Sequence, residues 1–185
     1  MNQALRDVAA LAAQTGLRRA DLIGLTWSEI GEVTITRIAR KKSKGKRRRV
    51  VMPILPSLQH LLDELKTRRR KPGVETVLVT SHGGSWSGNG LSGAFGKAIR
   101  ETDMHHVDSD GERQWKHLHD IRGTYATKLM ATAGLKLTNA EIANLMGWSP
   151  EQVEEIRTHY VDDAAIVVAV GERLAQAAVK RSVKR

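Results

Sequence analysis

The chain has 185 residues and a formal net charge of +10, from 30 Lys and Arg against 20 Asp and Glu. Such a positive excess is typical of proteins that bind polyanions, so we expect nucleic acid or an acidic substrate before an anionic membrane surface. The absence of Cys excludes disulfides, thiolate zinc sites and a cysteine nucleophile.

The predicted organisation is a single domain over residues 1–185, because no stretch rich in Pro, Gly or Ser divides the chain. The longest apolar run, residues 164–170, is far shorter than the ~20 residues that cross a bilayer. No charged-then-apolar signal segment opens the sequence. We therefore expect a soluble, cytoplasmic protein that does not act in a membrane.

Two helices are predicted at the start of the chain. Apolar residues recur at helical spacing at Leu5, Val8, Leu11 and Ala12. Thr15-Gly16 then ends this helix, and a second, shorter helix carries Leu22 and Leu25. Arg18 is therefore expected at the junction of the two helices.

A basic β-hairpin is predicted next. Apolar residues alternate over 33–35 and again over 50–54, and the connecting tip around Gly45 is rich in Lys and Arg. Charges at this density would repel one another unless a polyanion lay alongside, so we expect the hairpin to contact DNA; the alternative is a solvated charge run. The predicted DNA-contacting residues are Arg40, Lys41, Lys42, Lys46, Arg47, Arg48 and Arg49.

The rest of the pattern is mostly helical. Leucines at helical spacing indicate a helix around residues 58–65, and the apolar run 77–79 is a candidate third strand. Residues 102–114 are polar and are expected to form a loop. Further helices are predicted over 118–133, 139–146, 150–160 and 163–179. The predicted fold class is therefore mainly α (α+β), with one small three-stranded antiparallel sheet.

Four side chains in these elements suit phosphate chemistry. His119 and Arg122 are three residues apart, so on a helix they share a face and can address one phosphate. Each residue alone has an ordinary explanation. His119 can be a capping or core histidine, Arg122 a surface ion pair with Asp120, Arg18 a helix-end charge and Trp148 a core aromatic.

Tyr160 is the candidate nucleophile. It follows a polar helix, whereas the other tyrosine, Tyr125, sits in an apolar stretch where a packing role suffices. A phenol is only about 0.1% ionised at neutral pH, so attack on a phosphate requires removal of its proton and a phosphate whose charge is already neutralised. His119, Arg18 and Arg122 would supply those conditions.

A divalent-metal nuclease site is an alternative. The residues with suitable ligand types are His105, His106, Asp108, Asp110, His117, His119 and Asp120. Their spacing matches no ligand motif, and a hydrophilic loop is the favoured interpretation. We therefore predict no metal and no other cofactor.

Taken together, the motifs resemble the catalytic domain of the tyrosine recombinases, specifically the phage-integrase-type enzymes, over nearly the whole chain. In chain order they are Thr15-Gly16-Leu17-Arg18 with Asp21-Leu22, a Lys-bearing hairpin, His119-x-x-Arg122, Gly147-Trp148 and Tyr160. Each motif is weak alone, but five in the right order are specific. The resemblance implies that Arg18 and Arg122 clamp the phosphate, that His119 is a general acid or base, and that Tyr160 is the nucleophile.

The family also keeps a lysine in the hairpin as the acid that protonates the leaving group. Lys44, beside Gly45, fits this position best, and Lys42 is its competitor. Trp148 stands where the family commonly has a histidine; its indole N–H can still donate to a phosphate oxygen but cannot carry a proton.

Further departures from the family pattern concern the neighbours of these residues. Gly123 replaces a second histidine that often follows the second arginine, and Asp21, a shorter acid that could still orient Arg18, replaces a more usual Glu. The interval from Trp148 to Tyr160 is about one helical turn longer than in many relatives. Members normally carry an N-terminal helical DNA-clamping domain, so we expect this chain, which starts at the catalytic part, to be a fragment of a longer protein.

The resemblance implies a site-specific recombinase of phage or mobile-element type that cleaves double-stranded DNA, forms a 3′-phosphotyrosyl bond and needs neither metal nor ATP. Self-association into a recombination tetramer on DNA is expected, with residues 163–179 docking on a neighbouring protomer, while the isolated domain is expected to be monomeric. The alternatives are a type IB topoisomerase-like enzyme, which shares the chemistry but relaxes supercoils alone, and a non-catalytic DNA-binding module.

Overall fold

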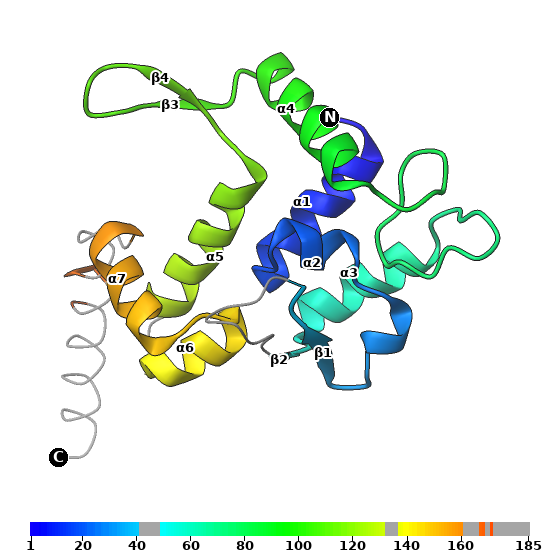
Figure 1. Cartoon of the computed structure of the whole chain (residues 1–185), viewed down its shortest axis with the longest axis horizontal. Helices are drawn as coiled ribbons and strands as arrows, with labels where there is room; N and C mark the ends of the chain where they lie inside the picture. The colour runs from blue at the N-terminus through cyan, green and yellow to red at the C-terminus, as the bar shows by residue number, and fades with distance from the viewer. Residues whose placement is uncertain (41–48, 132–136, 161–166, 169–170, 172–185) are drawn as a thin grey trace, which may run out of the picture.

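The computed structural model describes residues 1–40, 49–131, 137–160, 167–168 and 171, and Figure 1 shows a mostly helical chain with two small β-hairpins. The helices are α1 (Gln3–Thr15), α2 (Arg19–Ile23), the 3₁₀ helix η1 (Trp27–Glu29), α3 (Pro56–Lys66), α4 (Gly88–Glu101), α5 (Leu118–Ala131), α6 (Asn139–Met146) and α7 (Pro150–Tyr160). The strands are β1 (Thr34–Ile38), β2 (Arg49–Pro53), β3 (His105–Val107) and β4 (Arg113–Trp115). The predicted fold class is confirmed.

Helix α1 lies at the centre of the fold and contacts α2, α3 and α5. It begins where the Asn2 side chain accepts the N–H of Leu5, and it ends at Gly16, whose backbone is left-handed (φ 58°) and whose N–H donates to the Ala12 carbonyl. The apolar face that the sequence predicts is buried, with Val8 and Leu11 fully inaccessible. The helix therefore provides a rigid base beside which Arg18 emerges.

The sheet prediction needs one correction. β1 and β2 form the predicted antiparallel hairpin, with Ile35 opposite Met52 and both side chains in the core. The predicted third strand over 77–79 is wrong. The Val77 N–H donates to the carbonyl of Leu25, and Val79 forms only an isolated bridge with Ser85, so the backbone of this buried segment pairs with neighbouring loops instead of with the hairpin.

The loop predicted over 102–114 is also wrong, because this stretch contains the second hairpin, β3 and β4, with His105 opposite Trp115. Its turn is closed by the Asp108 carboxylate, which accepts the N–H groups of Asp110 and Glu112, and by Gly111 in the left-handed region. The hairpin projects from the body of the molecule beside the start of α5 (Figure 1).

The helices that end the chain follow the prediction closely. α6 and α7 have the predicted bounds, and α5 runs from Leu118 to Ala131, where the described residues stop. Most of the predicted helix 163–179 lies outside the described residues. Within the described residues, none of the helices is both long and apolar enough to span a bilayer.

Two hydrophobic clusters form the core. The first cluster is built from α1 to α4, the β1–β2 hairpin and residues 77–78. The second cluster consists of Ala126, Ile142, Ala143, Met146, Trp148 and Val153. Helix α5 joins them, because Leu118 and Ile121 pack against the first cluster and Leu129 and Met130 against the second. The candidate site residues lie along this junction.

Candidate active site

Arg18 is the residue immediately before α2, where its backbone is extended (φ −64°, ψ 149°). Its side chain is half-buried, and Nη2 donates to the carbonyl oxygen of Gly147 at 3.3 Å. Gly147 follows α6 in a left-handed conformation (φ 61°) that ends that helix. Arg18 thus reaches from the first cluster to the end of a helix in the second.

Arg122 lies on α5 and is only 4% exposed. Its guanidinium donates to the carbonyls of Gly16, after α1, and of Met146, the last residue of α6. These carbonyls carry the partial negative charge of helix C-termini, which stabilises a buried cation. The ion pair considered between Arg122 and Asp120 does not form; the Asp120 carboxylate instead accepts the N–H of His117 at the start of α5.

Burial is the main influence on the charge of Arg122. Burial, followed by the nearby charge of Arg18, lowers the pKa of the Arg122 guanidinium, and the Asp21 carboxylate partly offsets both effects, so that the pKa is about 9. The group is still a cation at neutral pH. An anion that binds beside both arginines would relieve their mutual repulsion, so the pair is suited to a phosphate.

Trp148 covers the face of this guanidinium. The centre of its ring lies 4.8 Å from the Arg122 Cζ, and the side chain is 8% exposed within the second cluster. This contact is a cation–π interaction that fixes the plane of Arg122. The packing role and the site role considered for Trp148 are therefore compatible.

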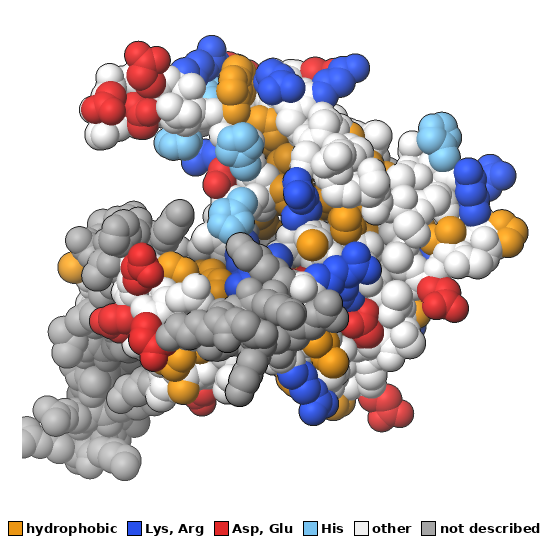
Figure 2. Space-filling view, in the orientation of Figure 1, with side chains coloured by type: hydrophobic (Ala, Val, Ile, Leu, Met, Phe, Trp, Pro, Cys, Tyr) orange, Lys and Arg blue, Asp and Glu red, His pale blue; other side chains and the backbone are white. Residues whose placement is uncertain are grey.

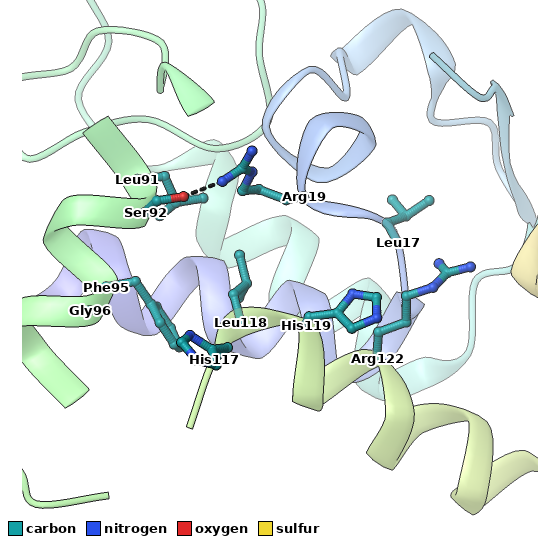
Figure 3. A pocket seen from close by; sticks show the side chains of 10 residues that line it. All are labelled: Leu17, Arg19, Leu91, Ser92, Phe95, Gly96, His117, Leu118, His119 and Arg122. Atoms are coloured by element: carbon teal, nitrogen blue, oxygen red, sulfur yellow. Dashed lines mark hydrogen bonds between the residues drawn. The ribbon is translucent and has the colours of Figure 1, made fainter. Parts of the chain in front are cut away.

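His119 is exposed in the first turn of α5 and borders two cavities. The smaller cavity, of about 250 Å³, is lined by Arg18, His119, Asp120, Arg122, Gly123, Trp148 and Ile156. The larger, of about 280 Å³, extends towards α4 and shares His119 and Arg122 with the first (Figure 3). Figure 2 shows that the surface is hollowed below the β3–β4 hairpin, with histidine side chains on the wall of the hollow.

Tyr160 is the last residue of α7, and the structure describes its backbone alone. Helix α7 starts at Pro150, two residues after Trp148. The Ser149 hydroxyl accepts the N–H of Gln152, and the Gln152 side chain accepts the N–H of Ser149. One turn before Tyr160, Ile156 lines the smaller cavity.

The hairpin residues are only partly within the described structure. Lys44 and five of the predicted DNA-contacting residues lie outside it, namely Lys41, Lys42, Lys46, Arg47 and Arg48. Arg40 and Arg49 are described, and both are exposed at the base of the hairpin tip.

Asp21 has a different role from the one expected. Its carboxylate accepts the backbone N–H of Arg40 at 2.8 Å and pairs with Arg37 Nε at 3.5 Å. Arg37 is buried and also pairs with Glu29. Asp21 therefore holds the base of the hairpin rather than Arg18, and its partner Arg37, one of the basic residues of the predicted hairpin, has a structural role.

The histidines and acids considered as metal ligands are dispersed. His105 Nδ1 lies 2.8 Å from the Asp103 carbonyl oxygen, and Asp108 is engaged in its own turn. Among the residues that the structure describes, no three His, Asp or Glu side chains are grouped so that they could hold one metal ion.

Comparison with known proteins places the chain. The model of the phage integrase family matches residues 2–165. Among solved structures, the chain is similar to a lambda integrase dimer bound to a COC′ core site, with 21% identity, a TM-score of 0.64, and 83% of this chain and 52% of that chain covered.

The chain is also similar to the Tn1549 transposon integrase in complex with circular intermediate DNA (19% identity, TM-score 0.62, 86% and 54% covered). A third similar structure is that of XerA recombinase (18% identity, TM-score 0.61, 91% and 56% covered). The chain thus spans about half the length of these structures. A comparison with curated proteins found no match.

Proposed function

The chain belongs to the phage integrase family, and from this premise we propose that it is a site-specific recombinase that cleaves and rejoins DNA strands through a 3′-phosphotyrosyl intermediate. One observation carries the proposal: Arg18, Arg122 and His119 line a single cavity that also borders α7, the helix that ends at Tyr160. Position 160 lies four residues after Ile156 and so on the face of α7 that borders this cavity.

In the proposed reaction, the two guanidiniums bind the non-bridging oxygens of one DNA phosphate. The Tyr160 oxygen attacks phosphorus and forms a P–O bond, while the bond from phosphorus to the 5′-oxygen breaks. The phenol proton passes to His119, the only histidine among the described residues that line the smaller cavity. The guanidiniums stabilise the charge that develops on the pentavalent phosphate, so we expect no requirement for a metal ion.

The leaving 5′-oxygen needs a proton, and we assign this step to Lys44, with Lys42 as the alternative. The products are a 3′-phosphotyrosyl bond and a free 5′-hydroxyl. Attack by the 5′-hydroxyl of another strand reverses the step, and because the energy of the broken bond is kept in the phosphotyrosyl bond, no ATP is needed. Exchange between two duplexes breaks four strands with one tyrosine each, so the active assembly on DNA is a tetramer. The recombinase would serve the integration or excision of a phage or mobile element.

Trapping a covalent adduct tests this function. Duplexes of random sequence, each nicked so that cleavage releases a short fragment, prevent religation, and the adduct is then isolated on a denaturing gel and its DNA is sequenced. We expect an adduct with the wild-type chain in the presence of a chelator. Tyr160→Phe should form none while it retains nearly the same DNA affinity, since the phenol supplies the attack and little of the binding.

Two outcomes would contradict the proposal. An adduct formed by Tyr160→Phe would exclude this nucleophile, and cleavage that stops in chelator would favour a metal nuclease. With the selected sequence in hand, strand exchange between two sites separates a recombinase from a type IB topoisomerase-like enzyme, which would only relax supercoils.

A further inference from the structure

Apart from His119 and Arg122, the residues that line the larger cavity beside the candidate active site have no role in the reaction described above. We propose that it is a second phosphate subsite, in which Arg19, held by Ser92, binds the DNA phosphate next to the scissile one on the same strand. This inference rests on the proposed function and adds a substrate contact to it.

Arg18 and Arg19 are neighbours in sequence but line different cavities. Arg18 lines the smaller cavity with Trp148, whereas Arg19 lines the larger one with Ser92 of α4. The two cavities meet at His119 and Arg122. The cationic side chains therefore form a row from Arg18 through Arg122 to Arg19. The reacting phosphate is expected between Arg18 and Arg122.

The spacing suits a DNA strand. Phosphates on one strand recur about every 3.4 Å along the helix axis, and successive phosphates are farther apart than this rise because the strand also winds around the axis. Consecutive Cα atoms are about 3.8 Å apart, so two adjacent residues bind different phosphates only where their side chains diverge. Side chains of adjacent residues that diverge into contiguous cavities can thus reach successive phosphates. A single phosphate would leave one of the two arginines without an anionic partner.

Arg19 is also held in position. Its Nη1 donates to the Ser92 hydroxyl, a contact drawn in Figure 3. The first turn of α4 lies alongside, since a Cβ added at Gly88 would be 3.9 Å from Arg19 Nη2. The guanidinium is exposed at the cavity and keeps donors for a ligand beyond the one that Ser92 accepts.

The charge around Arg19 favours an anion. Two buried or partly buried arginines elsewhere in the structure pair with carboxylates, Arg37 with Asp21 and Arg68 with Asp7. Among the described residues that line the larger cavity, none carries a carboxylate. The floor is apolar and comes from Leu17, Leu91, Phe95 and Leu118, which suits the sugar that follows a bound phosphate.

A chemical double-mutant cycle tests the subsite. Duplexes of the selected sequence carry one neutral methylphosphonate at each phosphate in turn around the cleavage point. For the wild-type chain, we expect neutralising one phosphate adjacent to the scissile one to slow adduct formation by about 10-fold to 100-fold, the effect of losing one charge-assisted hydrogen bond. Arg19→Ala should lose the same factor on unmodified DNA.

Coupling between the two changes is the decisive measurement. Arg19→Ala should be insensitive to methylphosphonate at that one phosphate and normally sensitive at the others. Ser92→Ala, which frees the guanidinium without removing it, should show a smaller loss. Arg100 is an exposed arginine on α4, the helix that carries Ser92, and it lines neither cavity. Arg100→Ala should therefore behave as wild type.

The subsite is excluded if the two losses multiply at every phosphate, or if Arg19→Ala cleaves as fast as the wild-type chain. Failure of the proposed function gives a different result, the absence of any wild-type adduct. In that case the same cycle is read from the affinities of duplexes selected by binding, where coupling confined to Arg19 and one phosphate still supports the subsite and its absence overturns it.

Discussion

The two hydrophobic clusters differ in size but share the candidate active site equally. Among described residues, the first cluster buries 21 apolar residues and the second buries six. Each contributes one arginine and one helix end. Arg18, beside the first cluster, bonds to the carbonyl of Gly147, and Arg122, on α5, bonds to that of Gly16 across the junction.

We call the first cluster with its elements the first half of the molecule, and the second cluster with α6 and α7 the second half. The geometry of the site therefore depends on how these two halves are packed together. If the halves separated, each arginine would lose a carbonyl acceptor from the opposite half, and the phosphate clamp would open with the junction. The halves also differ in surface charge. The described part of the second half carries Glu141, Glu151, Glu154 and Glu155 on α6 and α7, and Figure 2 shows acidic side chains gathered there, whereas the basic hairpin belongs to the first.

The largest effect is expected from removing Arg122, which donates to carbonyls of both halves. Arg122→Ala should slow adduct formation by at least about 10²–10³-fold, because a preorganised donor to the developing phosphate charge is lost. The rate is measured with the selected nicked duplex under single-turnover conditions.

Arg70→Ala is the matched control, since Arg70 also donates to backbone carbonyls, including those of Leu65 and Val77, and stacks on Trp27. It lies wholly in the first half. We expect it to lower the free energy of unfolding by about 1–3 kcal/mol with little change in the rate per folded molecule. Equal rate losses in both variants would mean that Arg122 is only structural.

The next effect concerns the turn that presents the Gly16 carbonyl to Arg122. A Cβ at Gly16 would lie 2.3 Å from the Tyr125 ring, and the backbone there is left-handed. Gly16→Ala should therefore cost about 1–2 kcal/mol for the conformation and a further ~1–3 kcal/mol for the clash. Denaturant unfolding measures the sum.

Gly73→Ala separates the two costs, because Gly73 is also left-handed (φ 77°) but a Cβ there would meet no atom within 4 Å. It should show the conformational cost alone. Adding Tyr125→Ala to Gly16→Ala should recover part of the stability that the clash removes. If Gly16→Ala and Gly73→Ala lose the same stability, the close approach to Tyr125 has no energetic weight.

These backbone contacts mark the limit of what the sequence could predict. Helix periodicity and Gly punctuation gave α1, α6 and α7, and the spacing of His119 and Arg122 gave their shared face. The acceptors of the arginines are main-chain carbonyls, which any residue can supply, so no residue type indicates them. The glycines that end α1 and α6 were visible, but not which side chains their carbonyls would meet.

The errors in the sheet have a similar origin. The apolar run 77–79 has the composition of a strand, and only tertiary pairing with loops distinguishes it from one. The β3–β4 hairpin was missed because its strands have three residues each and are largely polar. Asp21 was assigned to Arg18 by its place in the motif, although the structure pairs it with Arg37.

A smaller effect follows from the unequal burial of the two halves. Elements with fewer buried apolar contacts open more readily. Amide hydrogen exchange should therefore be at least ~10-fold faster in α6 than in α1, and binding of DNA to both arginines should slow exchange in α6. Uniform protection of the two helices would mean that the halves unfold as one unit.

The smallest effect is expected from the exposed charge at the base of the hairpin. If DNA is held mainly by the first half, Arg49→Ala should flatten the slope of log affinity against log salt concentration by up to ~0.9, the contribution of one neutralised phosphate. Changing Arg47 and Arg48 as well should flatten it by up to about three units.

Arg6→Ala is the control, because Arg6 is an exposed arginine on α1 that lines neither cavity of the site, and it should leave the slope unchanged. The slope counts neutralised phosphates and does not depend on the chemical step. It therefore reports DNA binding separately from catalysis by Arg18 and Arg122. A slope unaffected by the triple change would mean that the hairpin points away from DNA, and the charge difference between the two halves would then have no part in binding.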